Sequence, residues 1–178
     1  KDSGKDLYAA NADGNYIGFM GATSWEGFYL QEADGTVWHT AKSGSTATPF
    51  FLTTDAAEGT WDLWFPGQSG CYYTNVNTTK KLWTALWMPT LNVSGIDGGI
   101  TMEYKRDKNQ WQGIFTATGA GTINIQMNGT GKLYDNTSVS GADNSIDDTK
   151  AKDTPFAFNG SANELTFNTG TNVSAGNI

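Results

Sequence analysis

Residues 59–67 read Gly59-Thr60-Trp61-Asp62-Leu63-Trp64-Phe65-Pro66-Gly67, and this stretch decides the fold class. Large apolar residues recur at every second position between a glycine and a Pro-Gly pair, which is typical of a short β-strand bounded by turns. Because successive side chains of a strand point to opposite faces, Trp61, Leu63 and Phe65 share one face. That face is uniformly apolar, and we expect it to lie in the core.

The other face of this strand is a candidate binding surface, because it carries Asp62 and Trp64. An indole offers a flat apolar face that matches the C–H face of a sugar ring. A neighbouring carboxylate can accept hydrogen bonds from sugar hydroxyls. We therefore predict that Trp64 is exposed and that Asp62 and Trp64 contact a ligand.

Similar short strands extend in both directions along the chain. We expect strands at residues 16–20, 25–31, 36–39, 60–65, 72–77, 81–88, 100–105, 111–117, 122–128 and 164–167. Turn residues separate them at intervals of about eight to twelve residues, which is the spacing of a β-sandwich or barrel. The 178 residues include 22 glycines and 13% aromatics, a bias that also favours an all-β protein.

The two halves of the chain resemble each other. The matching segments are 6–16 with 90–100, which share an Asp-Gly turn (Asp13-Gly14 and Asp97-Gly98), and 25–29 with 111–115, which share a Trp-x-Gly motif. A period near half the chain indicates two copies of one unit, since solenoid repeats are shorter. We therefore expect two tandem, related immunoglobulin-like β-sandwich domains, residues 1–89 and 90–178. The tryptophans that recur in both copies, Trp25 and Trp111, are predicted to be structural packing residues.

Composition excludes several classes of function. The formal net charge is −7, whereas nucleic-acid binding requires a basic stripe, so we expect no nucleic-acid partner. Cys71 and His39 are the only cysteine and the only histidine. An internal disulfide and a cysteine-based zinc site therefore lack a required residue, and most transition-metal and Ser-His schemes would depend on His39 alone. We expect no cofactor and no metal ligand set. Residues 1–6 are polar and do not resemble a signal peptide. If the protein is exported, its signal peptide would have been removed before the first residue of this numbering.

A set of aromatic and Gly-containing segments resembles a known family. These segments are Trp83-Thr84-Ala85, Leu91–Gly95, Met102-Glu103-Tyr104, Trp111-Gln112-Gly113 and Gly121–Asn128, preceded by Gly59–Phe65 and Cys71–Asn77. Their order is similar to the tandem β-sandwich domains of the starch-utilisation-system E/F-type (SusE/SusF-like) outer-surface lipoproteins of Bacteroidetes. The resemblance implies a non-enzymatic glycan-binding protein at the cell surface, with other outer-membrane glycan-uptake proteins as partners. It also implies that the protein touches the membrane only through a lipid anchor outside this chain.

A second candidate platform lies on the strand 81–88. Trp83 and Trp87 share one face with Lys81 beside them and Ala85 between them, so the two indoles would stand roughly 13 Å apart across a shallow trough. Leu82, Leu86 and Met88 take the opposite face. This trough suits a chain of two or three sugars, but an inter-domain contact is an equal alternative. Trp38, which follows a turn and precedes His39, is left open between a binding role and core packing.

The carboxylates form no recognised motif. A glycosidase needs two acids on opposite sides of the scissile bond, and Asp62 and Glu58 would meet that requirement only by chance of folding. The loop carrying Asp143, Asp147, Asp148 and Asp153 lacks the spacing of a calcium loop, so a solvated acidic loop is favoured over a calcium site.

The sequence therefore predicts non-catalytic binding of a polysaccharide or oligosaccharide at a bacterial outer surface, in a glycan-uptake system. The alternative is a structural or protein-interaction module of a cell-surface assembly, and a glycoside-active enzyme is third. The predicted ligand-binding residues are Trp64, Trp83, Trp87, Trp38, Asp62 and Lys81. No catalytic residue is predicted.

Overall fold

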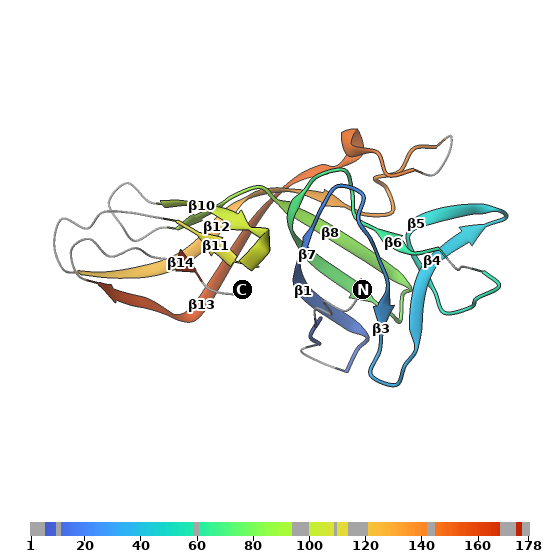
Figure 1. Cartoon of the computed structure of the whole chain (residues 1–178), viewed down its shortest axis with the longest axis horizontal. Coiled ribbons are helices and arrows are strands. Elements are labelled where there is room, and N and C mark those ends of the chain that lie inside the picture. Colours follow the sequence, from blue (N-terminus) through green and yellow to red (C-terminus); the bar gives the residue numbers. More distant parts are fainter. Residues whose placement is uncertain are drawn as a thin grey trace. The chain divides into compact units, whose positions relative to one another are not determined.

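The computed structural model (Figure 1) describes residues 6–9, 12–58, 61–93, 100–108, 110–113, 121–141, 145–167 and 174–175. Within these residues the chain is all-β, with fourteen strands and two short 3-10 turns, η1 (Arg106–Lys108) and η2 (Asp148–Lys150). The predicted all-β class is confirmed. The described residues contain no helix long and apolar enough to cross a membrane.

The chain divides into two compact units. The first contains Lys1–Trp87 and Lys132–Lys152, and the second contains Met88–Gly131 and Asp153–Ile178. The change of unit after Trp87 lies beside the boundary predicted at Pro89. The sequence, however, assigns 132–152 to the second half, whereas in the structure this segment packs with the first unit.

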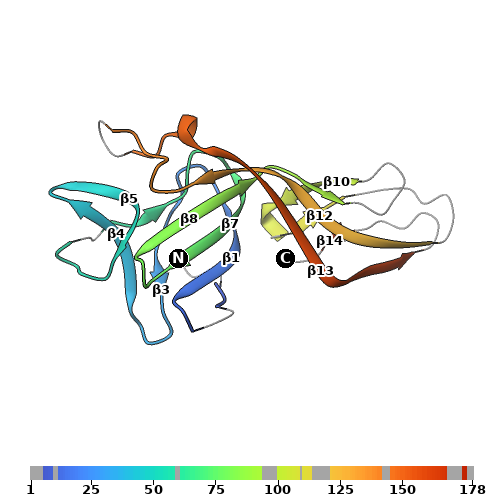
Figure 2. The same ribbon diagram turned by 180° about the vertical axis from the view of Figure 1, so that it is seen from behind.

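The first unit is built on an antiparallel sheet whose central members are visible side by side in Figures 1 and 2. Its strands, in spatial order, are β1 (Asn15–Ala22), β7 (Gly70–Asn77), β8 (Leu82–Met88), β5 (Thr46–Thr53), β4 (Val37–Ser43) and β3 (Leu30–Gln31). The end of β12 (Gly121–Tyr134) pairs with β8, from Lys132 opposite Trp87 to Tyr134 opposite Ala85. A separate two-stranded ribbon consists of β2 (Gly27–Phe28) and β6 (Leu63–Trp64).

The second unit contains shorter strands and the remainder of two long ones. Its strands are β9 (Leu91–Val93), β10 (Ile100–Lys105), β11 (Gln110–Gln112), β14 (Ser174–Ala175), most of β12 and nearly all of β13 (Lys152–Phe167). β10 pairs with β9 on one side and with β11 on the other. Trp111 in β11 is buried, and its ring lies 5.4 Å from that of Tyr104. The prediction that Trp111 is a packing residue is confirmed.

The core of the first unit is an aromatic cluster around Trp83. The ring centroids of Phe50, Phe28 and Phe65 lie 4.8, 5.2 and 6.1 Å from the Trp83 ring. Leu63 and Phe65 are buried in the same cluster, as the alternation of residues 60–65 predicts. Trp61 is the exception, because its side chain is 53% exposed. Trp61 lies outside β6 and is held by one bridge to Thr40, whose buried side chain takes the core position instead.

The trough predicted on strand 81–88 is wrong. Trp83 is only 2% exposed and Ala85 is fully buried, so their face is the core face. Leu86 and Met88 on the other face are buried as well. β8 is a central strand with partners on both edges, and alternation cannot identify the solvent face of a strand that is covered on both faces.

Truncating Trp83 tests the importance of this cluster. We expect Trp83→Ala to lower the free energy of unfolding by about 3–5 kcal/mol, because it removes the ring that three phenylalanines contact. The measurement is urea denaturation followed by circular dichroism. Trp83→Phe is the control and should cost much less, since it keeps an aromatic ring at the centre. A wild-type midpoint for Trp83→Ala would contradict the central role of Trp83.

Candidate functional site

The ribbon of β2 and β6 separates a core face from an outer face. Its two pairs are Gly27 with Trp64 and Phe28 with Leu63. Phe28 and Leu63 face the core, where the Phe28 ring stacks on Phe65 at 4.6 Å. Residues paired directly across two antiparallel strands share a face, so Gly27 and Trp64 lie on the opposite, outer side.

Exposed aromatic side chains gather at this ribbon. Trp25 is 50% exposed, Tyr29 45% and Trp61 53%, and all three lie within two residues of β2 or β6. Among the described residues, only Tyr8 and Phe51 are other large hydrophobic residues exposed to a similar degree. We name the set Trp25, Gly27, Tyr29, Trp61, Asp62 and Trp64 the aromatic ribbon. This concentration of exposed aromatic side chains makes the aromatic ribbon the candidate contact site.

Trp25 stands at one end of the ribbon in an unusual backbone conformation. Its φ is +58°, in the left-handed region that a bulky residue rarely adopts. The Trp25 N–H donates to the Pro66 carbonyl at 3.1 Å, and the Ser24 N–H donates to Ser69 Oγ at 3.0 Å. The Glu26 carboxylate accepts from the N–H and the hydroxyl of Thr23 at 2.7 and 2.9 Å. These bonds hold the turn that presents the indole.

The Trp25 indole lies beside a glycine and a carboxylate. A Cβ placed on Gly67 would lie 2.8 Å from Trp25 Cζ2 and 2.8 Å from Asp148 Oδ2. Both distances are too short for any side chain larger than hydrogen. Gly67 therefore allows the Trp25 indole and the Asp148 carboxylate to approach the same piece of backbone.

A buried tyrosine fixes the orientation of Asp148. The Tyr134 hydroxyl donates to Asp148 Oδ1 at 2.7 Å, and Tyr134 is almost fully buried in β12. Burial raises the pKa of Tyr134 far above its ordinary value, with further contributions from the hydrogen bond and the charge of Asp148. The phenol therefore stays protonated and remains a donor at neutral pH. Within the described part of the chain, Asp148 Oδ2 has no hydrogen-bond partner and can accept one from a ligand.

The other end of the ribbon carries a second carboxylate and two aromatic rings. Tyr29 directly follows β2, and Asp62 directly precedes β6, so the antiparallel pairing brings both to the same end. The Cβ and Oδ2 atoms of Asp62 lie 3.7 Å from the position that a Cβ on Gly27 would take. Gly27 is exposed and has no side chain, so its backbone surface beside the Asp62 carboxylate is uncovered by any side chain of its own.

Two of the predicted site residues belong to the aromatic ribbon. Asp62 is exposed, as predicted. Trp64 lies on the outer face, but it is half-buried and packs partly against the core cluster. The exposed indoles next to it come from Trp25 and Trp61, which the sequence assigns to packing positions.

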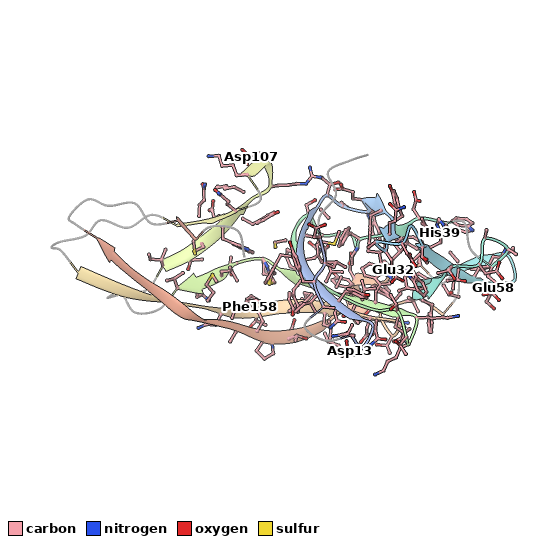
Figure 3. All side chains as sticks on the ribbon, turned by 90° about the horizontal axis from the view of Figure 1, so that it is seen from below. Asp13, Glu32, His39, Glu58, Asp107 and Phe158 are labelled. Atoms are coloured by element: carbon pink, nitrogen blue, oxygen red, sulfur yellow. The ribbon has the colours of Figure 1, made fainter. Side chains whose placement is uncertain are left out.

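The other predicted residues lie elsewhere. Trp83 and Trp38 are core residues, and the Trp38 indole N–H donates at 2.7 Å to Glu32, labelled in Figure 3. Trp87 is half-buried, and its indole N–H donates to the Ser69 carbonyl at 3.1 Å. Lys81 is exposed on the turn before β8, where its carbonyl accepts from the Leu52 N–H at 2.9 Å. Trp87 thus supports the loop that carries Gly67, and the structure does not unite these residues in a trough.

Sequence reasoning missed Trp25, Tyr29, Trp61 and Asp148. The repeat with Trp111 predicts packing for Trp25, which is wrong, because Trp25 sits in a turn while Trp111 sits in a strand. A local signal was present in Thr23-Ser24-Trp25-Glu26, since a Thr followed three residues later by Glu favours a closed local hydrogen-bond network. No local signal could place Asp148 beside Trp25, because the two residues are distant in sequence.

Two aspartates of the acidic loop, Asp147 and Asp148, make hydrogen bonds within the first unit. Asp147 Oδ1 accepts from the Thr149 N–H and hydroxyl at 2.9 and 2.6 Å, which caps η2. Asp148 is held by Tyr134, and Asp143 lies outside the described residues. Among the described residues, no three His, Cys, Asp or Glu side chains form a group that could hold a metal ion.

Comparison with known proteins gives one match. Residues 1–88 match a family model described as a domain of unknown function (DUF5111). The whole aromatic ribbon lies within these residues, whereas Tyr134 and Asp148 lie outside them. No curated protein and no solved structure matches the chain.

Replacing Trp25 in two ways measures the strain of its turn. Trp25→Gly should be more stable than Trp25→Ala by about 0.5–1 kcal/mol, because glycine avoids the left-handed penalty but loses more chain entropy on folding. Urea denaturation of both variants provides the comparison. Equal stabilities, or a more stable alanine variant, would show that the left-handed conformation is absent in solution.

Proposed function

We propose that this chain is a non-catalytic carbohydrate-binding protein of a bacterial outer surface, and that the aromatic ribbon is its binding site. The observation that carries the proposal is the exposed Trp25 indole, held in a left-handed turn beside the Asp148 carboxylate. Strained backbone conformations of bulky residues occur preferentially at functional sites. The resemblance of the sequence to outer-surface glycan-binding lipoproteins supports the same function.

The chemistry of the ribbon suits sugars. A sugar ring can lie on an indole through its C–H face while its hydroxyls donate to a carboxylate at the rim of the indole. Asp148 is already oriented by Tyr134, so less conformational entropy is lost when it accepts a hydrogen bond from a ligand. At the other end, the exposed Tyr29 and Asp62 supply a second aromatic ring and a second carboxylate.

We propose the cellular setting on the resemblance alone. The protein would be exported, anchored to the outer membrane by a lipid outside this chain, and associated with other glycan-uptake proteins. Incorporation of labelled palmitate and digestion by protease added to intact cells would test this setting. In the same way, we propose that the two units are related immunoglobulin-like sandwiches, with the Asp-Gly turns shared by the two halves of the sequence as support. Superposition of the two units in an experimental structure is the test.

A protein-interaction module is the second candidate function. Exposed Trp and Tyr side chains are enriched at protein interfaces as well as at sugar sites. The two functions differ in the size of the ligand that suffices for binding. A short soluble oligosaccharide should bind to a glycan site, whereas an interface requires a folded partner.

The glycan function predicts a Trp25-dependent affinity. We expect at least one glycan of a broad panel to bind with a dissociation constant near 1 mM, about −4 kcal/mol. Trp25→Ala should weaken that binding by the free energy of the lost apolar burial plus about 0.5–1.5 kcal/mol for the lost aromatic stacking. Affinity electrophoresis in polysaccharide gels and fluorescence titration provide the measurements.

The matched control for Trp25→Ala is Tyr8→Ala, which removes an even more exposed aromatic ring outside the ribbon (68% against 50%). Tyr8→Ala should bind like the wild type. The glycan function is wrong if no glycan binds, or if both variants lose affinity equally.

The same function predicts no hydrolysis. Purified protein incubated with starch, xylan or cellulose should release no reducing sugar above a buffer blank. Hydrolysis requires two acids held on opposite sides of one bond, and no motif of the sequence pairs Asp62 with another acid in this way. Release of reducing sugar that is lost in Asp62→Asn or Asp148→Asn would establish an enzyme instead.

A further inference from the structure

We infer that Trp87 is a positioning residue of the candidate site, which acts on a ligand through the Trp25 indole and not by touching the ligand itself. The inference rests on the proposed function and names what holds the exposed ring in place. Residues 66–69, which lead from β6 into β7, connect the two tryptophans, and we name them the support loop.

The turn that carries Trp25 lies next to the support loop because β1 pairs with β7. Ala22, the last residue of β1, pairs with Gly70, the first residue of β7. In an antiparallel pair, the chain that leaves one strand and the chain that enters the other lie at the same end. The turn at residues 23–26 therefore begins where the support loop enters β7, at one end of the sheet in Figure 2.

Trp25 rests on the support loop through its backbone and through its ring. Its N–H donates to the Pro66 carbonyl at 3.1 Å, and the N–H of the preceding Ser24 donates to Ser69 Oγ at 3.0 Å. A Cβ on Gly67 would lie 2.8 Å from Cζ2 and 3.2 Å from Cε2 of the Trp25 ring. The ring therefore packs directly on the backbone of the support loop, and a shift of this loop moves the ring.

Trp87 fixes the end of the support loop that enters β7. Its indole N–H donates to the Ser69 carbonyl at 3.1 Å. The same nitrogen lies 3.1 Å from the position of a Cβ on Gly70, whose φ of +138° is a conformation that favours glycine. Ser69 is thus held on two sides, because its carbonyl accepts from Trp87 and its hydroxyl accepts from Ser24.

Trp87 is itself held by the sheet. It lies in β8, pairs with Lys132 in β12 and packs partly against the core cluster. A ring on a paired strand can therefore fix a loop that is otherwise at the surface. A binding side chain that is fixed before the ligand arrives loses less conformational entropy on binding, so the affinity rises without any further contact.

The test is a double-mutant cycle on binding by the full chain. Affinity electrophoresis is run in gels that contain soluble starch, xylan, mannan or another polysaccharide of the panel, and uses whichever retards the wild type. Trp87→Phe keeps an aromatic ring and removes the N–H donor, and we expect it to weaken binding about three- to tenfold, the factor that one lost hydrogen bond represents. In the Trp25→Ala background the same substitution should change the affinity by less than about twofold, because the residue through which it acts is gone.

Ser69→Ala tests the same connection from the side of the turn. Ser69 is exposed, so its substitution leaves the core intact. It removes the acceptor for the Ser24 N–H and should weaken binding only where Trp25 is present. The matched control is Trp38→Phe, which also removes an indole N–H donor, in this case to Glu32. It should bind like the wild type, because neither Trp38 nor Glu32 belongs to the support loop or to the turn.

Fluorine NMR provides a second measurement that needs no ligand. The seven tryptophans are replaced by 5-fluorotryptophan, and the signal that disappears in Trp25→Ala belongs to Trp25. This signal should move or broaden in Trp87→Phe and in Ser69→Ala, and it should keep its position in Trp38→Phe.

Several results would overturn the inference. One is a wild-type affinity in both Trp87→Phe and Ser69→Ala, and another is a Trp25 signal that neither variant moves. A third is equal weakening by Trp87→Phe with and without the Trp25 ring, because Trp87 would then contact the ligand or support the fold as a whole. Each of these results leaves the proposed function intact, since the wild type still binds. If no glycan of the panel retards the wild type, the proposed function fails, and the inference fails with it.

Discussion

The burial of Trp83 among Phe28, Phe50 and Phe65 is the interaction on which the rest of the first unit depends. It joins β8 to β5 and to the β2–β6 ribbon, three segments that are distant in sequence. Because Phe28 and Leu63 must face this cluster, their neighbours Gly27 and Trp64 must face outward. The position of the candidate site is thus set by the core rather than by its own residues.

The sequence predicted the fold class and one strand face well. Residues 60–65 alternate so regularly that Leu63 and Phe65 could be assigned to the core, and both are there. Alternation failed at Trp61, which precedes the start of β6, and on 81–88, where both faces are covered. The alternation along a strand shows which residues share a face. The elements packed against that strand decide which of its two faces is exposed to solvent.

The candidate site was less predictable, because its parts converge through tertiary structure. Asp62 and Trp64 follow from one strand, but Trp25 depends on a turn whose hydrogen bonds reach Pro66 and Ser69. Asp148 depends on Tyr134 and on the absence of a side chain at Gly67. The left-handed conformation is not confined to the site, because the buried Phe50 beside Trp83 has a φ of +71° and the exposed Trp25 a φ of +58°.

The return of residues 132–152 to the first unit has a consequence for synthesis on the ribosome. The strand that pairs with the far end of β8, and the aspartate beside Trp25, are translated after the whole of segment 88–131. At roughly 5–20 residues per second, the chain waits several seconds between β8 and its partner in β12. During that interval the edge of β8 is open to other strands, which is the kind of edge that promotes aggregation. The nascent protein therefore carries this unpaired edge of β8 until residues 132–134 have been made.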